Sequence, residues 1–141
     1  MKQTIVIASV LALLLITAAC GSKTDTAGGG SGKTIASVKV NDLTATLSNS
    51  TGQVKSGNQD VTLTFTDSAG KPVDVGAVSL NFHMPGMGSM APMNNAVTFT
   101  TSTAGVYHGK VNVEMAGEWQ GQLAYEGPAG KGKATFSVTA R

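Results

Sequence analysis

The chain gathers soft metal ligands into one short segment, HMPGMGSMAPM at residues 83–93. His83 opens the segment, and methionines follow at every third position: Met84, Met87, Met90 and Met93. Thioether sulfurs favour Cu(I) over harder cations, and an imidazole suits the same ion. The segment therefore predicts a binding site for Cu(I), for which Ag(I) would serve as a surrogate.

The residues between the methionines decide what kind of segment carries them. A spacing of three would also suit a buried helical stripe, but Pro85 and Pro92 lack a backbone donor, and Gly86 and Gly88 disfavour helix through their conformational freedom. We therefore expect a loop. Methionine also fills irregular gaps in hydrophobic cores, so a packing lid or a protein-contact loop remains the alternative to a metal site.

Side chains alternate between two faces along the preceding strand, so the candidate ligands at its end are expected to point in different directions. If a strand from Ala77 continues through Met84, then Met84 points to the core and His83 points outward, because successive side chains of a strand face opposite ways. Both would bind one ion only if the strand breaks before Pro85. Met84 is thus expected as either ligand or core residue, and His108 is a further candidate ligand expected on an exposed face.

Three residues outside this segment are expected in the core. Met115 shares the parity of Val111 and Val113, which favours packing. Tyr107 and Trp119 are the large aromatic side chains expected to anchor a core otherwise filled by Val, Leu and Phe.

The N-terminus resembles that of a bacterial lipoprotein. Lys2 precedes an apolar run over residues 5–19, which is followed by Cys20, the only cysteine of the chain. A basic start, an apolar stretch and small residues before the cleavage point are typical of a secretory signal peptide, and the run is shorter than the roughly 20 residues of a membrane-spanning helix. We expect residues 1–19 to be a removed lipoprotein signal peptide and Cys20 to carry lipid. The alternative is an ordinary signal peptide with a free cysteine nearby.

The rest of the chain divides into a tether and one domain. Residues 20–34 hold no large apolar side chain and are rich in Gly, Ser and Thr, which predicts a flexible linker. Residues 35–141 are long enough for a single domain.

Alternation with a period of two dominates this domain, and turn residues separate the alternating runs. The expected pattern is all-β: an immunoglobulin-like β-sandwich of about seven strands. A shift of alternation at Asn41-Asp42 predicts a bulge or break within the first run. The runs lie near residues 36–47, 61–67, 77–84, 95–101, 105–115, 118–126 and 133–140.

Composition argues against two classes of function. The formal net charge is only +2 and no basic stripe with interleaved aromatics is present, so we expect no nucleic-acid binding. With two histidines and a cysteine assigned to the lipid site, neither a nucleophilic triad nor a three-ligand zinc centre is expected. We expect a binding protein, not an enzyme.

Motifs in the second half of the chain resemble the YtkA-like domain family, which is related to the FixH-like group. They are Met84-Pro85-Gly86-Met87, Gly105-Val106-Tyr107-His108-Gly109 and Met115-Ala116-Gly117-Glu118-Trp119. The resemblance covers residues 36–140. It implies an immunoglobulin-like sandwich exported from bacteria, with a link to copper handling.

Together these patterns predict an extracytoplasmic cell-envelope protein, held at a membrane by lipid on Cys20, that binds Cu(I) for trafficking or resistance. A membrane cuproenzyme or a copper transporter would be its partner. The rival hypothesis is an assembly or adaptor module that contacts a membrane protein without metal.

The anchor is tested by replacing Cys20 with Ser. We expect the protein to move from the membrane fraction to the soluble fraction, because the thiol that receives the lipid is gone. Immunoblots of fractionated cells measure this shift. Retention of the variant in the membrane fraction, after normal removal of the signal peptide, would contradict a lipid anchor at Cys20.

Overall fold

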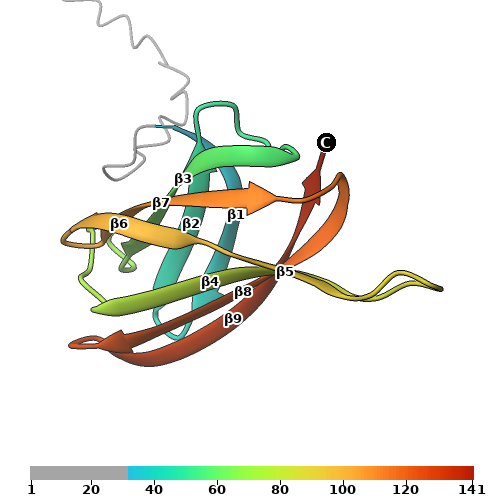
Figure 1. Ribbon diagram of the computed structural model, residues 1–141. Coiled ribbons are helices and arrows are strands. Elements are labelled where there is room, and N and C mark those ends of the chain that lie inside the picture. The colour runs from blue at the N-terminus through green and yellow to red at the C-terminus, as the bar shows by residue number, and fades with distance from the viewer. Residues whose placement is uncertain (1–31) are drawn as a thin grey trace, which may run out of the picture.

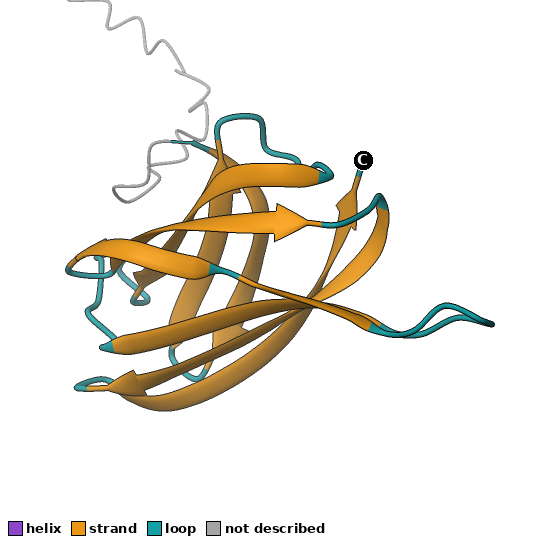
Figure 2. Cartoon of the chain, viewed as in Figure 1, coloured by secondary structure: helices purple, strands orange, loops and turns teal. Residues whose placement is uncertain are grey.

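The computed structural model describes residues 32–141, and the regular structure in this range is entirely β-strand (Figure 2). The expected signal peptide and Cys20 lie outside the described residues. No helix within this range is long and apolar enough to cross a bilayer. The strands are β1 (Lys33–Val40), β2 (Leu43–Asn49), β3 (Gly57–Thr66), β4 (Ala77–Met84), β5 (Met93–Ala96), β6 (Thr98–Thr103), β7 (Val106–Val113), β8 (Gly117–Gly127) and β9 (Gly130–Ala140).

The strands form two antiparallel sheets that pack face to face (Figure 1). One sheet has five strands in the order β1-β2-β3-β7-β6, and the other has four in the order β5-β4-β8-β9. Side chains from the inner faces of both sheets form the core, as expected for sheets that each bury one face. The expected β-sandwich is confirmed, with nine strands where the sequence predicted about seven.

One extra strand comes from the first alternating run, which is a hairpin and not a single bulged strand. β1 and β2 pair directly, from Val40 with Leu43 to Lys33 with Asn49. Asn41 lies in the turn at φ 56°, a left-handed conformation that Asn tolerates better than most residues. Its amide nitrogen donates to Tyr125 Oη at 3.1 Å, which ties the turn to β8. The expected bulge or break is therefore a chain reversal.

The other extra strand arises because the run expected near 95–101 changes sheets. β5 pairs with β4 in the four-stranded sheet, whereas β6 pairs with β7 in the five-stranded sheet. Val97 lies between them, buried, and its amide donates to the Leu80 carbonyl at 2.8 Å. One extended segment thus closes this side of the sandwich.

Trp119 is the largest fully buried side chain of the core. It is 1% exposed, and its indole nitrogen donates to the Met115 carbonyl at 3.1 Å, so the polar edge of the ring is satisfied. This bond also fixes the turn between β7 and β8, where Met115 packs against the core. The expected core roles of Trp119 and Met115 are confirmed.

Tyr107 joins the core to the connection between β3 and β4. Its ring packs edge-on against Phe65, and its hydroxyl lies 3.3 Å from the Val75 amide and 3.1 Å from the Gly76 carbonyl. Burial raises the pKa of the Tyr107 phenol. The hydroxyl holds the segment that carries the chain from one sheet to the other, and the predicted core position of Tyr107 is confirmed.

Replacing Trp119 with Ala should lower the free energy of unfolding by about 3–5 kcal/mol, the usual cost of deleting a buried aromatic side chain. Denaturant unfolding followed by circular dichroism measures the loss. Gln120→Ala, at the exposed neighbouring position of β8, is the matched control and should stay within about 0.5 kcal/mol of the parent. Equal effects of the two substitutions would contradict the assigned packing.

Candidate methionine hairpin

The segment expected as a loop is an antiparallel hairpin that extends β4 and β5 beyond the sandwich (Figure 1). Met84 pairs with Met93 at the end of the strands, and Met87 pairs with Met90 three residues further along each arm. The Met90 amide donates to the Met87 carbonyl at 2.9 Å. Gly88, at φ 59°, supplies the first position of the two-residue turn, where glycine has the least steric cost. We call residues 84–93 the methionine hairpin.

Gly86 lets the two arms of the hairpin pack closely. A Cβ atom at this position would lie 2.9 Å from the Met90 carbonyl oxygen and 3.2 Å from Pro92 Cδ. A larger residue would therefore push the arms apart. The small residue at position 86 helps to hold the turn and its two methionines in register.

The pair at the base of the hairpin belongs to the sandwich core. Met84 is 4% exposed, and its Cε atom lies over Gly117, where an added Cβ would come within 2.9 Å of it. Met93 is half-buried and packs against the same core cluster. Of the two roles that the sequence left open for Met84, its position in the structure is that of a core residue.

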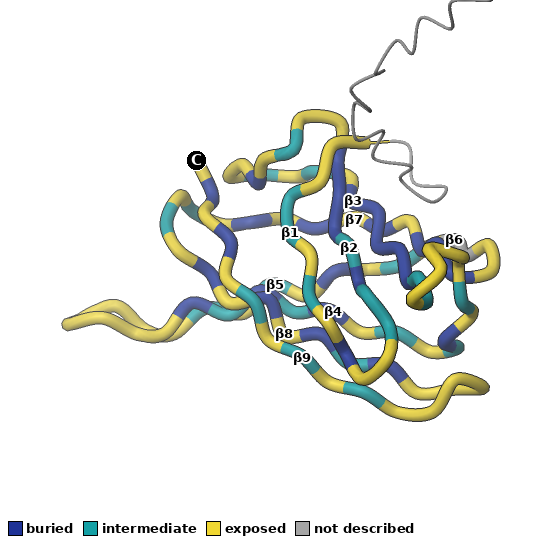
Figure 3. Tube along the Cα trace, turned by 180° about the vertical axis from the view of Figure 1, so that it is seen from behind, coloured by how far each residue is buried: buried dark blue, intermediate teal, exposed yellow. Residues whose placement is uncertain are grey.

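The pair at the tip, in contrast, is exposed to solvent. Met87 is 65% exposed and Met90 is 45% exposed, and they are the exposed large hydrophobic side chains of the described range (Figure 3). Directly opposed residues of an antiparallel pair have Cβ atoms about 4.5–5.5 Å apart. Two flexible thioethers at that separation can both reach one metal ion.

His83 lies beside the hairpin base with a defined hydrogen-bond partner. Its Nδ1 atom is 2.9 Å from Asn94 Oδ1, which also accepts a hydrogen bond from Asn81 Nδ2 at 3.1 Å. Because an amide oxygen only accepts, this contact requires a proton on Nδ1, which in the neutral ring leaves the lone pair on Nε2. Histidine ligands of metals usually have this arrangement, with the second ring nitrogen donating to an oxygen.

His83 is nevertheless separate from the tip of the hairpin. Met87 lies four positions further along the extended chain, about 13 Å away at roughly 3.3 Å per residue. It also points to the face opposite the Met84 and Met93 side chains, since these adjacent positions alternate. The structure thus brings together Met87 with Met90 and Met84 with Met93, and it leaves His83 apart from both pairs.

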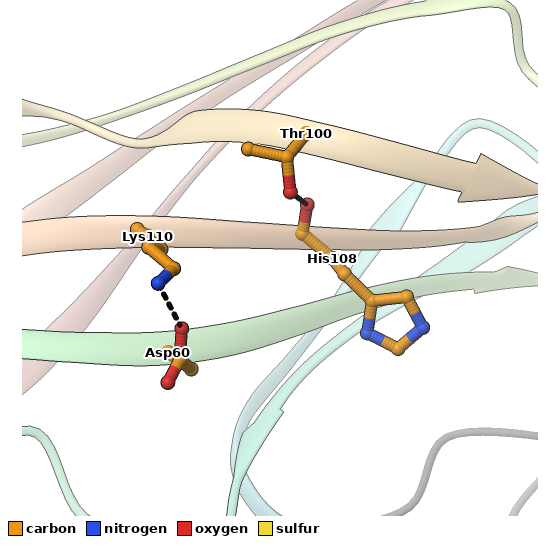
Figure 4. A network of polar contacts seen from close by, with 4 residues as sticks. All are labelled: Asp60, Thr100, His108 and Lys110. Atoms are coloured by element: carbon orange, nitrogen blue, oxygen red, sulfur yellow. Dashed lines mark hydrogen bonds and ion pairs between the residues drawn. The ribbon is translucent and has the colours of Figure 1, made fainter.

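His108, the other candidate histidine, belongs to the five-stranded sheet. It is exposed on β7, and its Nδ1 atom lies 3.1 Å from Thr62 Oγ1. Figure 4 shows its surroundings: the His108 carbonyl accepts from Thr100, and Lys110 forms an ion pair with Asp60 at 3.7 Å. These polar contacts belong to the outer surface of one sheet, and no methionine is among them.

His, Cys and carboxylate side chains do not gather into a metal-binding group in the described range: among residues 32–141, no three of them come together. The thioethers of the methionine hairpin are the candidate donors for a soft ion because of their own chemistry, with the tip pair exposed, Met84 buried and Met93 half-buried.

Sequence reasoning missed that the methionines pair across a hairpin, although the sequence carries a signal of this pairing. The segment is symmetric about Gly88-Ser89: methionines stand at 87 and 90, prolines at 85 and 92, and methionines again at 84 and 93. Such symmetry around a two-residue turn is what a hairpin requires, because each residue must face its counterpart. The interpretation of the methionines as a repeat of three residues did not take this symmetry into account.

Comparison with known proteins identifies one family. The family model described as YtkA-like matches residues 37–124, which run from β1 into β8 and include the methionine hairpin. Neither a curated protein nor a solved structure matched the chain.

The assigned histidine tautomer is testable by long-range ¹H–¹⁵N correlation spectra of the imidazole rings. Neutral His83 should be protonated at Nδ1, because Asn94 Oδ1 accepts that proton. Asn94→Leu removes the acceptor and should move the proton toward Nε2, while His108 in the same spectrum should not change. A parent spectrum with the His83 proton on Nε2 would contradict the geometry.

Proposed function

The chain belongs to the YtkA-like family, and from this premise we propose that it is a lipid-anchored protein of the cell envelope that binds Cu(I) on the methionine hairpin. Copper is its cargo, which the protein carries or sequesters. The partner that donates or receives the ion would be a membrane cuproenzyme or a copper transporter.

The observation that carries this proposal is the exposure of the tip pair. Met87 and Met90 face each other across a hydrogen-bonded turn, yet both side chains are exposed to solvent. Apolar side chains stabilise a fold by leaving water, so these two contribute little to the stability of the sandwich. Their types and placement instead suit a ligand from outside the chain.

The chemistry of the pair favours Cu(I). Thioethers are soft, uncharged donors, and they need not lose a proton before they bind. Two of them on one turn form a chelating pair that leaves coordination positions for a further donor. An open site of this kind suits an ion that must be passed on, because a partner's ligand can enter before the first two leave.

Thioether ligands suit the proposed location of the protein in the cell envelope. Thiols in an exported protein tend to form disulfides, whereas thioethers cannot. The expected lipid on Cys20 lies 13 residues before the start of β1, so a short tether would keep the hairpin near the membrane. A partner embedded in that membrane is then within reach.

The rival adaptor hypothesis depends on the same exposed pair. Two methionines on a projecting turn could enter an apolar pocket of a membrane protein, since flexible thioether side chains adapt to irregular surfaces. The two hypotheses differ in one respect: only the first requires the isolated protein to bind metal.

Substituting both Met87 and Met90 by Leu should reduce Cu(I) affinity about 100-fold or more, equivalent to about 2.7 kcal/mol. Leucine keeps a similar volume but supplies no donor. Competition with a colorimetric Cu(I) chelator measures the affinity, and Ag(I) titration provides an independent reading.

Met115→Leu is the matched control, because it removes a thioether packed against the core outside the methionine hairpin. Its Cu(I) affinity should equal that of the parent. The melting temperature of the tip double variant should also stay close to the parent value, since the tip side chains are exposed. Absence of Cu(I) binding by the parent protein would reject the proposal and favour the adaptor.

A further inference from the structure

The methionine hairpin places two thioether pairs of the same chemistry in very different environments. The base pair begins in the core, where Met84 is 4% exposed, whereas the tip pair is 65% and 45% exposed at Met87 and Met90. Both pairs lie within ten residues of the chain and share one hairpin register. Any reagent that attacks sulfur from solvent therefore meets the tip first.

The relevant reagents are two-electron oxidants. They attack a sulfur lone pair, and the thioether sulfur becomes a sulfoxide. A hypohalous acid is the chemical class that we consider: the sulfur lone pair takes the chlorine of HOCl, water then replaces the chlorine, and overall the thioether and HOCl give the sulfoxide, chloride and a proton. Sulfur loses two electrons and gains the oxygen atom, and chlorine gains the two electrons and leaves as chloride.

We propose that Met87 and Met90 form a methionine-oxidation site, at which a hypohalous acid converts the tip pair to sulfoxides while the base pair stays reduced. Exposure of the tip and burial of Met84 within a single hairpin carry this inference. The tip packs against no core residue, so the sandwich tolerates the more polar sulfoxide groups. Methionine sulfoxide reductases make such a modification reversible.

Oxidation at the tip has a consequence that rests on the proposed function. A sulfoxide presents a hard oxygen in place of a soft sulfur lone pair, so it is a poor ligand for Cu(I). The modified hairpin would release its cargo. A bound ion would in turn occupy the lone pairs that the oxidant needs, and metal and oxidant would exclude each other.

The experiment treats the purified full chain with limiting hypochlorite and locates the added oxygen by peptide mass spectrometry. Met87 and Met90 should be modified about tenfold faster than Met84, in keeping with their exposure. In the Met87→Leu, Met90→Leu double variant the same dose should still leave Met84 unmodified, because the burial of Met84 does not depend on the tip side chains, and the circular dichroism spectrum should match that of the parent. Modification of Met84 or Met93 as fast as the tip would overturn the assignment.

A second arm repeats the treatment with Ag(I) bound, with binding measured beforehand by calorimetry. Protection of Met87 and Met90, and loss of Ag(I) binding after oxidation of the free chain, support the link to metal. If calorimetry detects no Ag(I) binding while the tip still oxidises first, the proposed function fails and the oxidation site stands. If Ag(I) binds but the oxidised chain binds it equally well, the claimed consequence for metal is overturned.

Discussion

The antiparallel pairing of β4 with β5 determines how the candidate donors are grouped. β5 is the edge strand of the four-stranded sheet, β4 is held by β8 on its other side, and the register of the β4–β5 pair continues into the hairpin without a shift. Met87 then faces Met90 because Met84 faces Met93. A slip of one residue would give each methionine a new partner and turn it to the other face. Backbone hydrogen bonds of the sandwich, which lie outside the methionine hairpin, therefore determine which methionines pair.

The arrangement separates stability from chemistry along a single hairpin. At its base, Met84 packs over Gly117 and shares the core with Trp119, so the hairpin is anchored in the hydrophobic core. At its tip, the close approach at Gly86 and the turn at Gly88 keep two sulfurs paired without a core of their own. Under the proposed function, the backbone that carries this pair is already ordered before an ion binds. The side chains that stabilise the fold and the side chains that would meet the proposed ion are thus different members of the same residue type.

Local patterns in the sequence were sufficient for the fold class and for the inner face of most strands. The alternating runs through Tyr107 and Trp119 predict which side chains are buried, because burial on one sheet face follows a period of two. Two features were missed because they depend on distant contacts. The reversal at Asn41 is fixed by Tyr125, 84 residues away, and the change of sheet at Val97 depends on which strands lie next to each arm. The candidate donors could likewise be named from the sequence. Their division into a pair packed on the core and an exposed pair follows from cross-strand register, and the orientation of His83 follows from its bond to Asn94.

Symmetry about Gly88-Ser89 has a consequence for the changes of length that this hairpin can absorb. If the two-residue turn and the pairing at Met84 and Met93 are both kept, each arm must lengthen or shorten by the same number of residues, so such changes come in twos. One added pair would turn the tip residues to the opposite face, and only a change of two pairs would return them to the original one. With this turn kept, the length of the hairpin changes in steps of two residues, and the direction in which the tip presents its side chains repeats every four.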